Sequence, residues 1–104
     1  MGGTPRKLVR SLAEQRALEA VEYIARDRPG AAASWLDKLL KRVKEITQFA
    51  QQGRVVREIG LPAYRELLHA PYRIIYRVDA ARVVILTLRH VRRAWDTAEV
   101  DVGV

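Results

Sequence analysis

The apolar residues of this chain change their spacing about halfway along the sequence, and this change limits the possible folds more than any other feature. Before it, Leu36, Leu39, Leu40, Val43 and Ile46 recur at the three- and four-residue spacing of an amphipathic helix. After it come short apolar segments typical of strands, separated by turn-forming Gly, Pro and Asp residues. Helices followed by a strand meander predict an α+β fold.

The first half of the chain predicts one short strand and the first helix of a hairpin. Residues 6–10 are expected to form the strand. Ser11 and Glu14 have the spacing of a capping box, in which each side chain bonds the other residue's backbone N–H, so a helix is expected to start at Ser11. This helix is expected to end near residues 26–27, because a Pro-Gly pair follows closely.

The second helix is expected to begin just after Gly30 and to close over residues 51–53. Gly53 is predicted to cap it in the left-handed conformation, which glycine adopts without strain. Trp35 lies on this helix, and tryptophan is common both in cores and at interfaces. It therefore predicts either a core position or a contact in a homodimer.

Four strands are predicted in the second half of the chain. They are expected at residues 54–58, 64–68, 72–78 and 82–88. The last is almost wholly apolar, which is typical of a central strand covered on both faces. The sequence thus predicts a single domain over residues 1–104, in which an N-terminal helical hairpin packs on one face of a small, mainly antiparallel, twisted sheet of four to five strands.

Alternation along the third of these strands predicts which side chains face the helices. That set comprises Tyr72, Ile74, Tyr76 and Val78. The opposite set, Arg73, Ile75 and Arg77, is expected on an open basic surface. Turning the strand over would bury two arginines, which is costly unless they have partners.

Positive charge is the main compositional signal. Nineteen Lys and Arg residues outnumber twelve Asp and Glu residues, and the net charge of +7 favours anionic partners. Residues 54–93 hold nine arginines, no lysine and three acidic residues. Guanidinium is planar and can clamp two oxygens of a phosphate or carboxylate, so this preference for Arg indicates geometric recognition. Some of these arginines, such as Arg57 and Arg82, are instead expected to keep strand edges from pairing with other chains.

Several classes of protein and site are excluded or disfavoured. The chain has no cysteine, which excludes disulfides, thiol nucleophiles and cysteine-bound metals and is in keeping with a cytoplasmic location. Two isolated histidines predict no metal site and no cofactor. No apolar run reaches the roughly 20 residues of a membrane helix. Residues 1–5 are expected to be a flexible lead-in and residues 97–104 a flexible acidic tail, with Trp95 packing against the sheet before it.

Four segments of the second half carry a family resemblance. They read GRVVRE at 53–58, YREL at 64–67, PYRIIYRV at 71–78 and VILTLRHVRR at 84–93. In this order, after a helical hairpin, they resemble the RelE/ParE superfamily, and the resemblance covers about residues 7–96. Its members are toxins of type II toxin–antitoxin systems, often described as plasmid-stabilisation proteins. The resemblance implies growth inhibition and a cognate antitoxin as partner.

The superfamily implies two mechanisms. RelE-like members cleave mRNA on the ribosome without a metal, which needs a base, a cation and an acid. Here Glu58 would be the base, Arg73 the phosphate-stabilising cation, His90 the acid and Arg65 a second phosphate contact. ParE-like members inhibit DNA gyrase without nuclease chemistry. No lysine follows Lys44, unlike the lysine-rich catalytic sets of some RelE-like enzymes, and the ending HVRRAWD resembles that of ParE-like members.

Each candidate also has a plainer interpretation. Glu58 would pair with a neighbouring arginine, His90 would bond to backbone at a strand end, and Arg73 would bind acidic groups of the antitoxin. His69 is expected to have no functional role. The arginines expected to bind nucleic acid or the antitoxin are Arg54, Arg65, Arg73, Arg77, Arg89, Arg92 and Arg93. The alternative function is a non-toxic basic module that binds nucleic acid, or a degenerate toxin.

Overall fold

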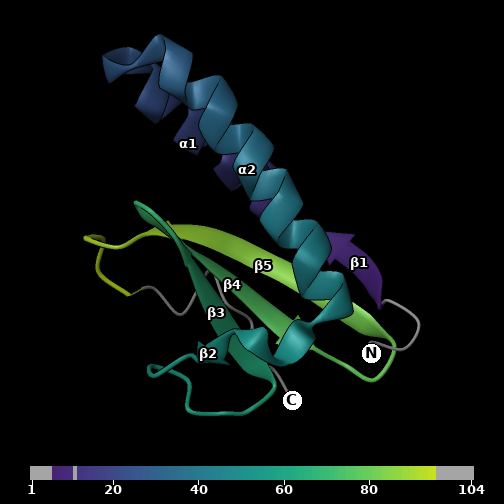
Figure 1. Ribbon diagram of the computed structural model, residues 1–104. Coiled ribbons are helices and arrows are strands. Elements are labelled where there is room, and N and C mark those ends of the chain that lie inside the picture. Colours follow the sequence, from purple (N-terminus) through teal and green to yellow (C-terminus); the bar gives the residue numbers. More distant parts are fainter. Residues whose placement is uncertain (1–5, 11, 96–104) are drawn as a thin grey trace.

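The computed structural model describes residues 6–10 and 12–95. The chain forms, in order, β1 (Lys7–Arg10), α1 (Ala13–Asp27), α2 (Pro29–Gln48), the short 3-10 helix η1 (Ala50–Gln52), β2 (Arg54–Val55), β3 (Tyr64–His69), β4 (Tyr72–Val78) and β5 (Arg82–His90). Figure 1 shows the two helices as a layer on one side of the sheet. The predicted α+β architecture is confirmed. The expected lead-in and acidic tail lie outside the described residues.

The five strands form one sheet in the order β1-β5-β4-β3-β2. β1 pairs in parallel with β5, and the other pairs are antiparallel. The pairing of β4 with β5 shifts register between Ile75 and Tyr76, which marks a bulge. β5 lies inside the sheet, between β1 and β4, as its apolar sequence leads one to expect of a strand covered on both faces.

β2 is much shorter than the predicted 54–58. Only Arg54 and Val55 belong to the strand, because the chain turns on itself immediately afterwards. The carbonyl of Val56 accepts backbone hydrogen bonds from Ile59 at 3.1 Å and from Gly60 at 2.8 Å. Gly60 closes this turn with a φ of 73°, a conformation that favours glycine.

The helices also begin at other residues than predicted. α1 starts at Ala13, and Leu12 before it makes no capping hydrogen bond through its side chain. The proposed cap, Ser11, lies outside the described residues. α2 starts at Pro29, before Gly30, because proline fits the first turn of a helix, where its missing N–H is not needed. Neither described helix is both long and apolar enough to cross a membrane.

Gly53 does not form the predicted left-handed cap. Its φ of −74° and ψ of 155° are those of extended backbone. Glycine is required there by space: a Cβ atom would clash with the Tyr76 hydroxyl and lie 2.7 Å from the carbonyl oxygen of Glu66. The Gly53 N–H donates to the Tyr76 hydroxyl at 3.0 Å, and that hydroxyl donates to the carbonyl of Ala50 at 2.8 Å. Tyr76 thus ties the end of the helical half to the sheet.

The main core lies between the helices and the sheet. All four residues predicted for the helix-facing side of β4 belong to it, as do Leu39 and Ile46 of α2. Trp35 packs against this core as well, with its ring 5.5 Å from that of Tyr72, and its Nε1–H donates to the carbonyl of Ala70 at 2.9 Å. These contacts confirm a position for Trp35 at the edge of the core.

The opposite face of the sheet is not the open basic surface that was predicted. A second apolar cluster occupies its middle, made of Val56, Tyr64, Ile75, Val84 and Leu86 with Val9, Ile59 and Trp95 packed against it. The turn after β2 supplies part of this cover, which a regular strand over residues 54–58 would not. The predicted packing of Trp95 on the sheet is confirmed.

Candidate functional site

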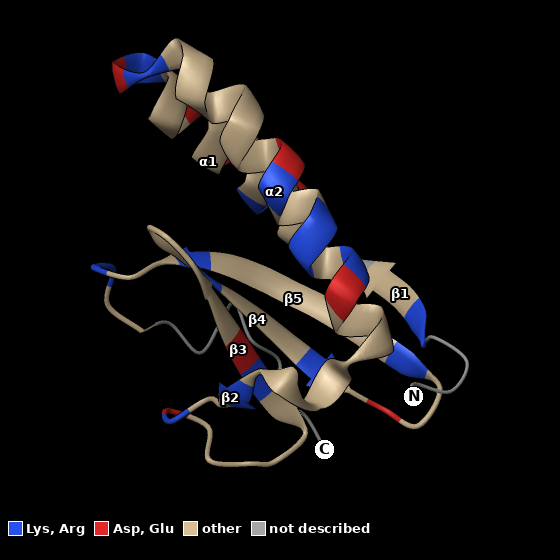
Figure 2. Ribbon diagram, viewed as in Figure 1, with Lys and Arg blue, Asp and Glu red and all other residues tan. Residues whose placement is uncertain are grey.

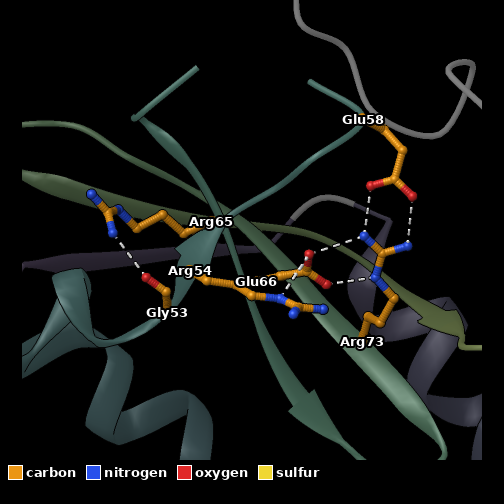
Figure 3. A network of polar contacts seen from close by, with 6 residues as sticks. All are labelled: Gly53, Arg54, Glu58, Arg65, Glu66 and Arg73. Carbon is orange, nitrogen blue, oxygen red and sulfur yellow. Dashed lines mark hydrogen bonds and ion pairs between the residues drawn. The ribbon is translucent and has the colours of Figure 1, made fainter. Parts of the chain in front are cut away.

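Arg73 is the centre of a network of charged side chains on the second face of the sheet. Its Nη1 and Nη2 donate to the two carboxylate oxygens of Glu58 at 3.0 and 2.8 Å. Its Nε and Nη2 donate to the two oxygens of Glu66 at 2.5 and 3.1 Å. Figure 3 shows the guanidinium held between both carboxylates. Four of the five N–H donors of an arginine are therefore engaged within the chain.

The network is nearly neutral as a whole. Hydrogen bonds from Arg73 hold the pKa of Glu58 below its usual value, and bonds to Glu58 and then Glu66 raise the pKa of Arg73. Arg54 adds a second cation, with its Nε 3.4 Å from an oxygen of Glu66. Two guanidinium groups thus face two carboxylates. Trp95 lies over the Arg73 guanidinium, at 5.4 Å from the ring centroid.

This network lines a groove of about 750 Å³. Besides the network, the groove is lined by Arg57, by the end of β2 and by the exposed side chains of Leu68 and Val91. Leu68 is 59% exposed and Val91 47% exposed. Apolar side chains beside charged ones are typical of surfaces that bind other proteins.

Arg65 lies away from this groove. It stands opposite Tyr76 in the β3–β4 register, so its side chain points to the helix-facing side of the sheet. Its Nη1 donates to the carbonyl of Gly53 at 2.8 Å and its Nε to that of Pro62 at 3.1 Å. Figure 3 shows Arg65 and Arg73 directed away from each other. Arg65 therefore secures the chain before β2 and the turn before β3.

His90 is also on the helix-facing side, at the end of β5. It stands opposite Tyr72, and its ring makes T-shaped contacts with Tyr72 at 5.2 Å and with Tyr23 of α1 at 5.9 Å. Its Nδ1 accepts the backbone N–H of Arg92 at 3.1 Å. This is the bond to backbone that was the plainer interpretation of a strand-end histidine.

The four residues proposed for nuclease chemistry consequently do not share one site. Glu58 and Arg73 are in contact on one face of the sheet, and Arg65 and His90 lie on the other face at separate places. Arg73 and His90 are on adjacent strands, but their side chains point in opposite directions, since Arg73 pairs with Arg89 and not with His90. The structure forms no cluster of base, cation and acid from this set.

The family comparison decides the identity of the chain. The family model "ParE toxin of type II toxin-antitoxin system, parDE" matches residues 8–95. The chain belongs to the ParE toxin family. A solved structure described as the chromosomal ParDE TA system from P. aeruginosa is similar in fold, with a TM-score of 0.70 and 22% sequence identity. The match covers 86% of this chain and 100% of the other. No curated protein matches the chain.

The other arginines predicted on the second half of this ParE-family chain lie in several different environments. Arg77 and Arg82 both approach Asp79, at 3.5 and 2.8 Å. The hydrogen bond from Arg82 is the main cause that lowers the pKa of this partly exposed carboxyl. Arg89 is buried, and its guanidinium lies 5.6 Å from the centroid of the Trp95 ring. Arg92 and Arg93 line a pocket beside α1.

Sequence reasoning gave no role to Glu66, which proves central to the network. Its side chain is only 4% exposed. The signal was present in the YRE segment: alternation from Tyr64 places Glu66 on the same face as Ile75, its register partner, and so on the face of Arg73. An acidic residue at an inward-facing strand position predicts a buried cationic partner.

Proposed function

We propose that this member of the ParE toxin family inhibits DNA gyrase by binding it, without nuclease chemistry, and that a cognate antitoxin neutralises it. Family membership supports the toxin class. The separation of Arg73 from His90 and Arg65 supports a non-hydrolytic mechanism. A gyrase-directed toxin acts in the cytoplasm, which is the location we propose.

One observation carries most of this proposal: Arg73 donates four hydrogen bonds to Glu58 and Glu66. A catalytic arginine must offer its donors to the phosphate as charge develops. Here a phosphate would first have to displace a carboxylate and would then meet its negative charge. The network is better suited to stabilising the groove.

The groove is the surface that we propose for protein recognition. Exposed Leu68 and Val91 offer apolar contacts, and exposed Arg57 offers charge. A chain segment that combines apolar and acidic side chains fits such a surface. An antitoxin bound there would cover whatever part of the groove the target needs.

Ribosome-dependent mRNA cleavage is the second candidate, and one contact favours it. Glu58 and Arg73 lie side by side, as a base and a phosphate-binding cation would have to. This function would require the network to open and an acid other than His90 to protonate the leaving oxygen.

Inducible expression tests the proposal in cells. The wild-type chain is expected to stop growth, and co-expression of its cognate antitoxin is expected to restore growth. His90→Ala is expected to remain toxic, because no hydrolysis depends on an acid at this position. Loss of toxicity in folded His90→Ala, together with loss of mRNA cleavage, would contradict the proposal and favour the second candidate.

A further inference from the structure

A second pocket lies between α1 and the end of β5, separate from the groove around Arg73. Its volume is about 510 Å³, within the range of sites that hold small organic ligands. α1 contributes Tyr23 and Arg26, and the end of β5 and the turn after it contribute His90, Arg92 and Arg93. Figure 2 shows basic residues just past the end of β5, and both basic and acidic residues at the α1–α2 turn.

Positive charge is less compensated in this pocket than in the groove. Four arginines line it against a single acidic residue, Glu19. Glu19 is already engaged by Arg16, whose Nη1 lies 2.8 Å from one of its oxygens. Within residues 6–10 and 12–95, the side chains of Arg26 and Arg92 form no ion pair, and both residues are exposed. An anion would therefore gain attraction here without displacing a carboxylate from these two side chains.

Aromatic rings line the same pocket as these arginines. Tyr23 is 53% exposed although it packs against the ring of His90. His90 in turn rests against buried Tyr72, and its Nδ1 is held by the backbone of Arg92. The T-shaped contact with His90 covers one part of the Tyr23 ring and leaves much of the ring exposed to solvent. His90 is itself held in place by Tyr72 and by the backbone of Arg92. An exposed aromatic ring beside arginines such as Arg26 and Arg92, which form no ion pair within the described part of the chain, is the combination that stacks nucleic-acid bases and holds their phosphates.

We propose that this pocket binds a nucleotide unit, with its base stacked on Tyr23 and its phosphate held by Arg26 and Arg92. Guanidinium groups bind phosphate oxygens through paired, charge-assisted hydrogen bonds. An acidic peptide would use the arginines but has no base to stack on the ring. The nucleotide unit can come from a free nucleotide or from single-stranded nucleic acid, which share this chemistry. The proposal is independent of how the toxin acts on its target.

Binding of a fluorescent twelve-nucleotide oligothymidylate, followed by anisotropy, tests the proposal, with unlabelled ATP as the free-nucleotide probe. Tyr23→Ala is expected to weaken oligonucleotide binding about tenfold, and Tyr23→Phe is expected to keep it. Arg26→Ala and Arg92→Ala are expected to weaken binding and each to lower the slope of log affinity against log salt by about 0.7. Arg57→Ala is the matched control, since Arg57 is an exposed arginine that lines the groove around Arg73 and not this pocket.

The outcomes separate the two sources and the failure of the proposal. If ATP binds and displaces the labelled oligonucleotide, and Tyr23→Ala weakens both effects, the ligand is a free nucleotide. If the oligonucleotide binds but ATP does not displace it, the ligand is single-stranded nucleic acid. The proposal is overturned if neither probe binds, if Tyr23→Ala binds like wild type, or if Arg57→Ala weakens binding as much as Arg26→Ala. Circular dichroism checks that each variant is folded, which the exposure of these side chains leads us to expect.

Discussion

Arg73 connects three separate segments of the chain through its side chain alone. It lies on β4, Glu66 lies on β3, and Glu58 belongs to the turn after β2. Its side chain is 16% exposed and that of Glu66 is 4% exposed. Because both groups have lost most of their contact with water, each charge is stabilised mainly by the opposite charge of the other. The sequence predicted Arg73 and Glu58 as candidates, but it could not show that the strand register would bring Glu66 against the same guanidinium as Glu58.

Removal of Arg73 is expected to destabilise the fold. In Arg73→Ala, the longer contact with Arg54 is the one ion pair left to Glu66 among residues 6–10 and 12–95, so a nearly buried carboxylate loses its main partner. We expect a loss of about 3 kcal/mol in the free energy of unfolding, measured by urea denaturation. Exposed Arg57→Ala is the control and is expected to change stability by less than about 0.5 kcal/mol. Equal stability of Arg73→Ala and wild type would show that the network does not support the fold.

The lowered pKa of Glu58 predicts a pH dependence. A carboxyl whose pKa is lower in the folded state adds stability above its unfolded pKa of about 4.3, and this stability is lost as the pH falls through the folded pKa. Wild type is therefore expected to exceed Glu58→Gln in stability at neutral pH and to lose this advantage below about pH 4. Urea denaturation across this range measures the difference. A stability gap between wild type and Glu58→Gln that stays constant across this pH range would contradict the assignment.

Among the elements, β4 was the most predictable from sequence and β2 the least. β4 has the predicted bounds and faces, because its alternation is regular and both of its neighbours are strands. β2 ends after two residues because the carbonyl of Val56 accepts the hydrogen bonds of a turn, and no pattern in the sequence predicted a turn at this residue. The same turn covers the face that was expected to be open.

The connection between the helical half and the sheet depends on the absence of a side chain at Gly53. A methyl group there would collide with the Tyr76 hydroxyl, whose position is fixed by Ala50. Gly53→Ala is therefore expected to lower the free energy of unfolding by about 2 kcal/mol, measured by thermal or urea denaturation.

Gly30→Ala provides the matched comparison for this substitution. Gly30 lies in α2 with open space around its Cβ position, so alanine is expected to stabilise the fold by about 0.5 kcal/mol through its higher helix propensity. If both glycine variants changed stability in the same direction and by similar amounts, the close approach of Tyr76 would not explain Gly53.

At the scale of the whole molecule, the arginines of the second half are divided among distinct surroundings. Figure 2 shows that the middle of β5 carries no charged residue, while basic residues gather at the ends of the sheet and on the helices. Arg73 is neutralised by carboxylates, whereas Arg92 faces a pocket with little opposing charge. The net charge of +7 predicted an anionic partner, but only the fold could separate structural arginines from those available to bind one.

The function that we propose for this ParE-family toxin is inhibition by binding gyrase, and not by cutting RNA. Its most direct test adds the purified chain to gyrase with relaxed plasmid DNA and, in parallel, to translating ribosomes. Inhibition by binding predicts that supercoiling is inhibited by wild type and by His90→Ala alike, while mRNA on the ribosomes stays intact. Cleaved mRNA with unaffected supercoiling, and loss of that cleavage in His90→Ala, would contradict it.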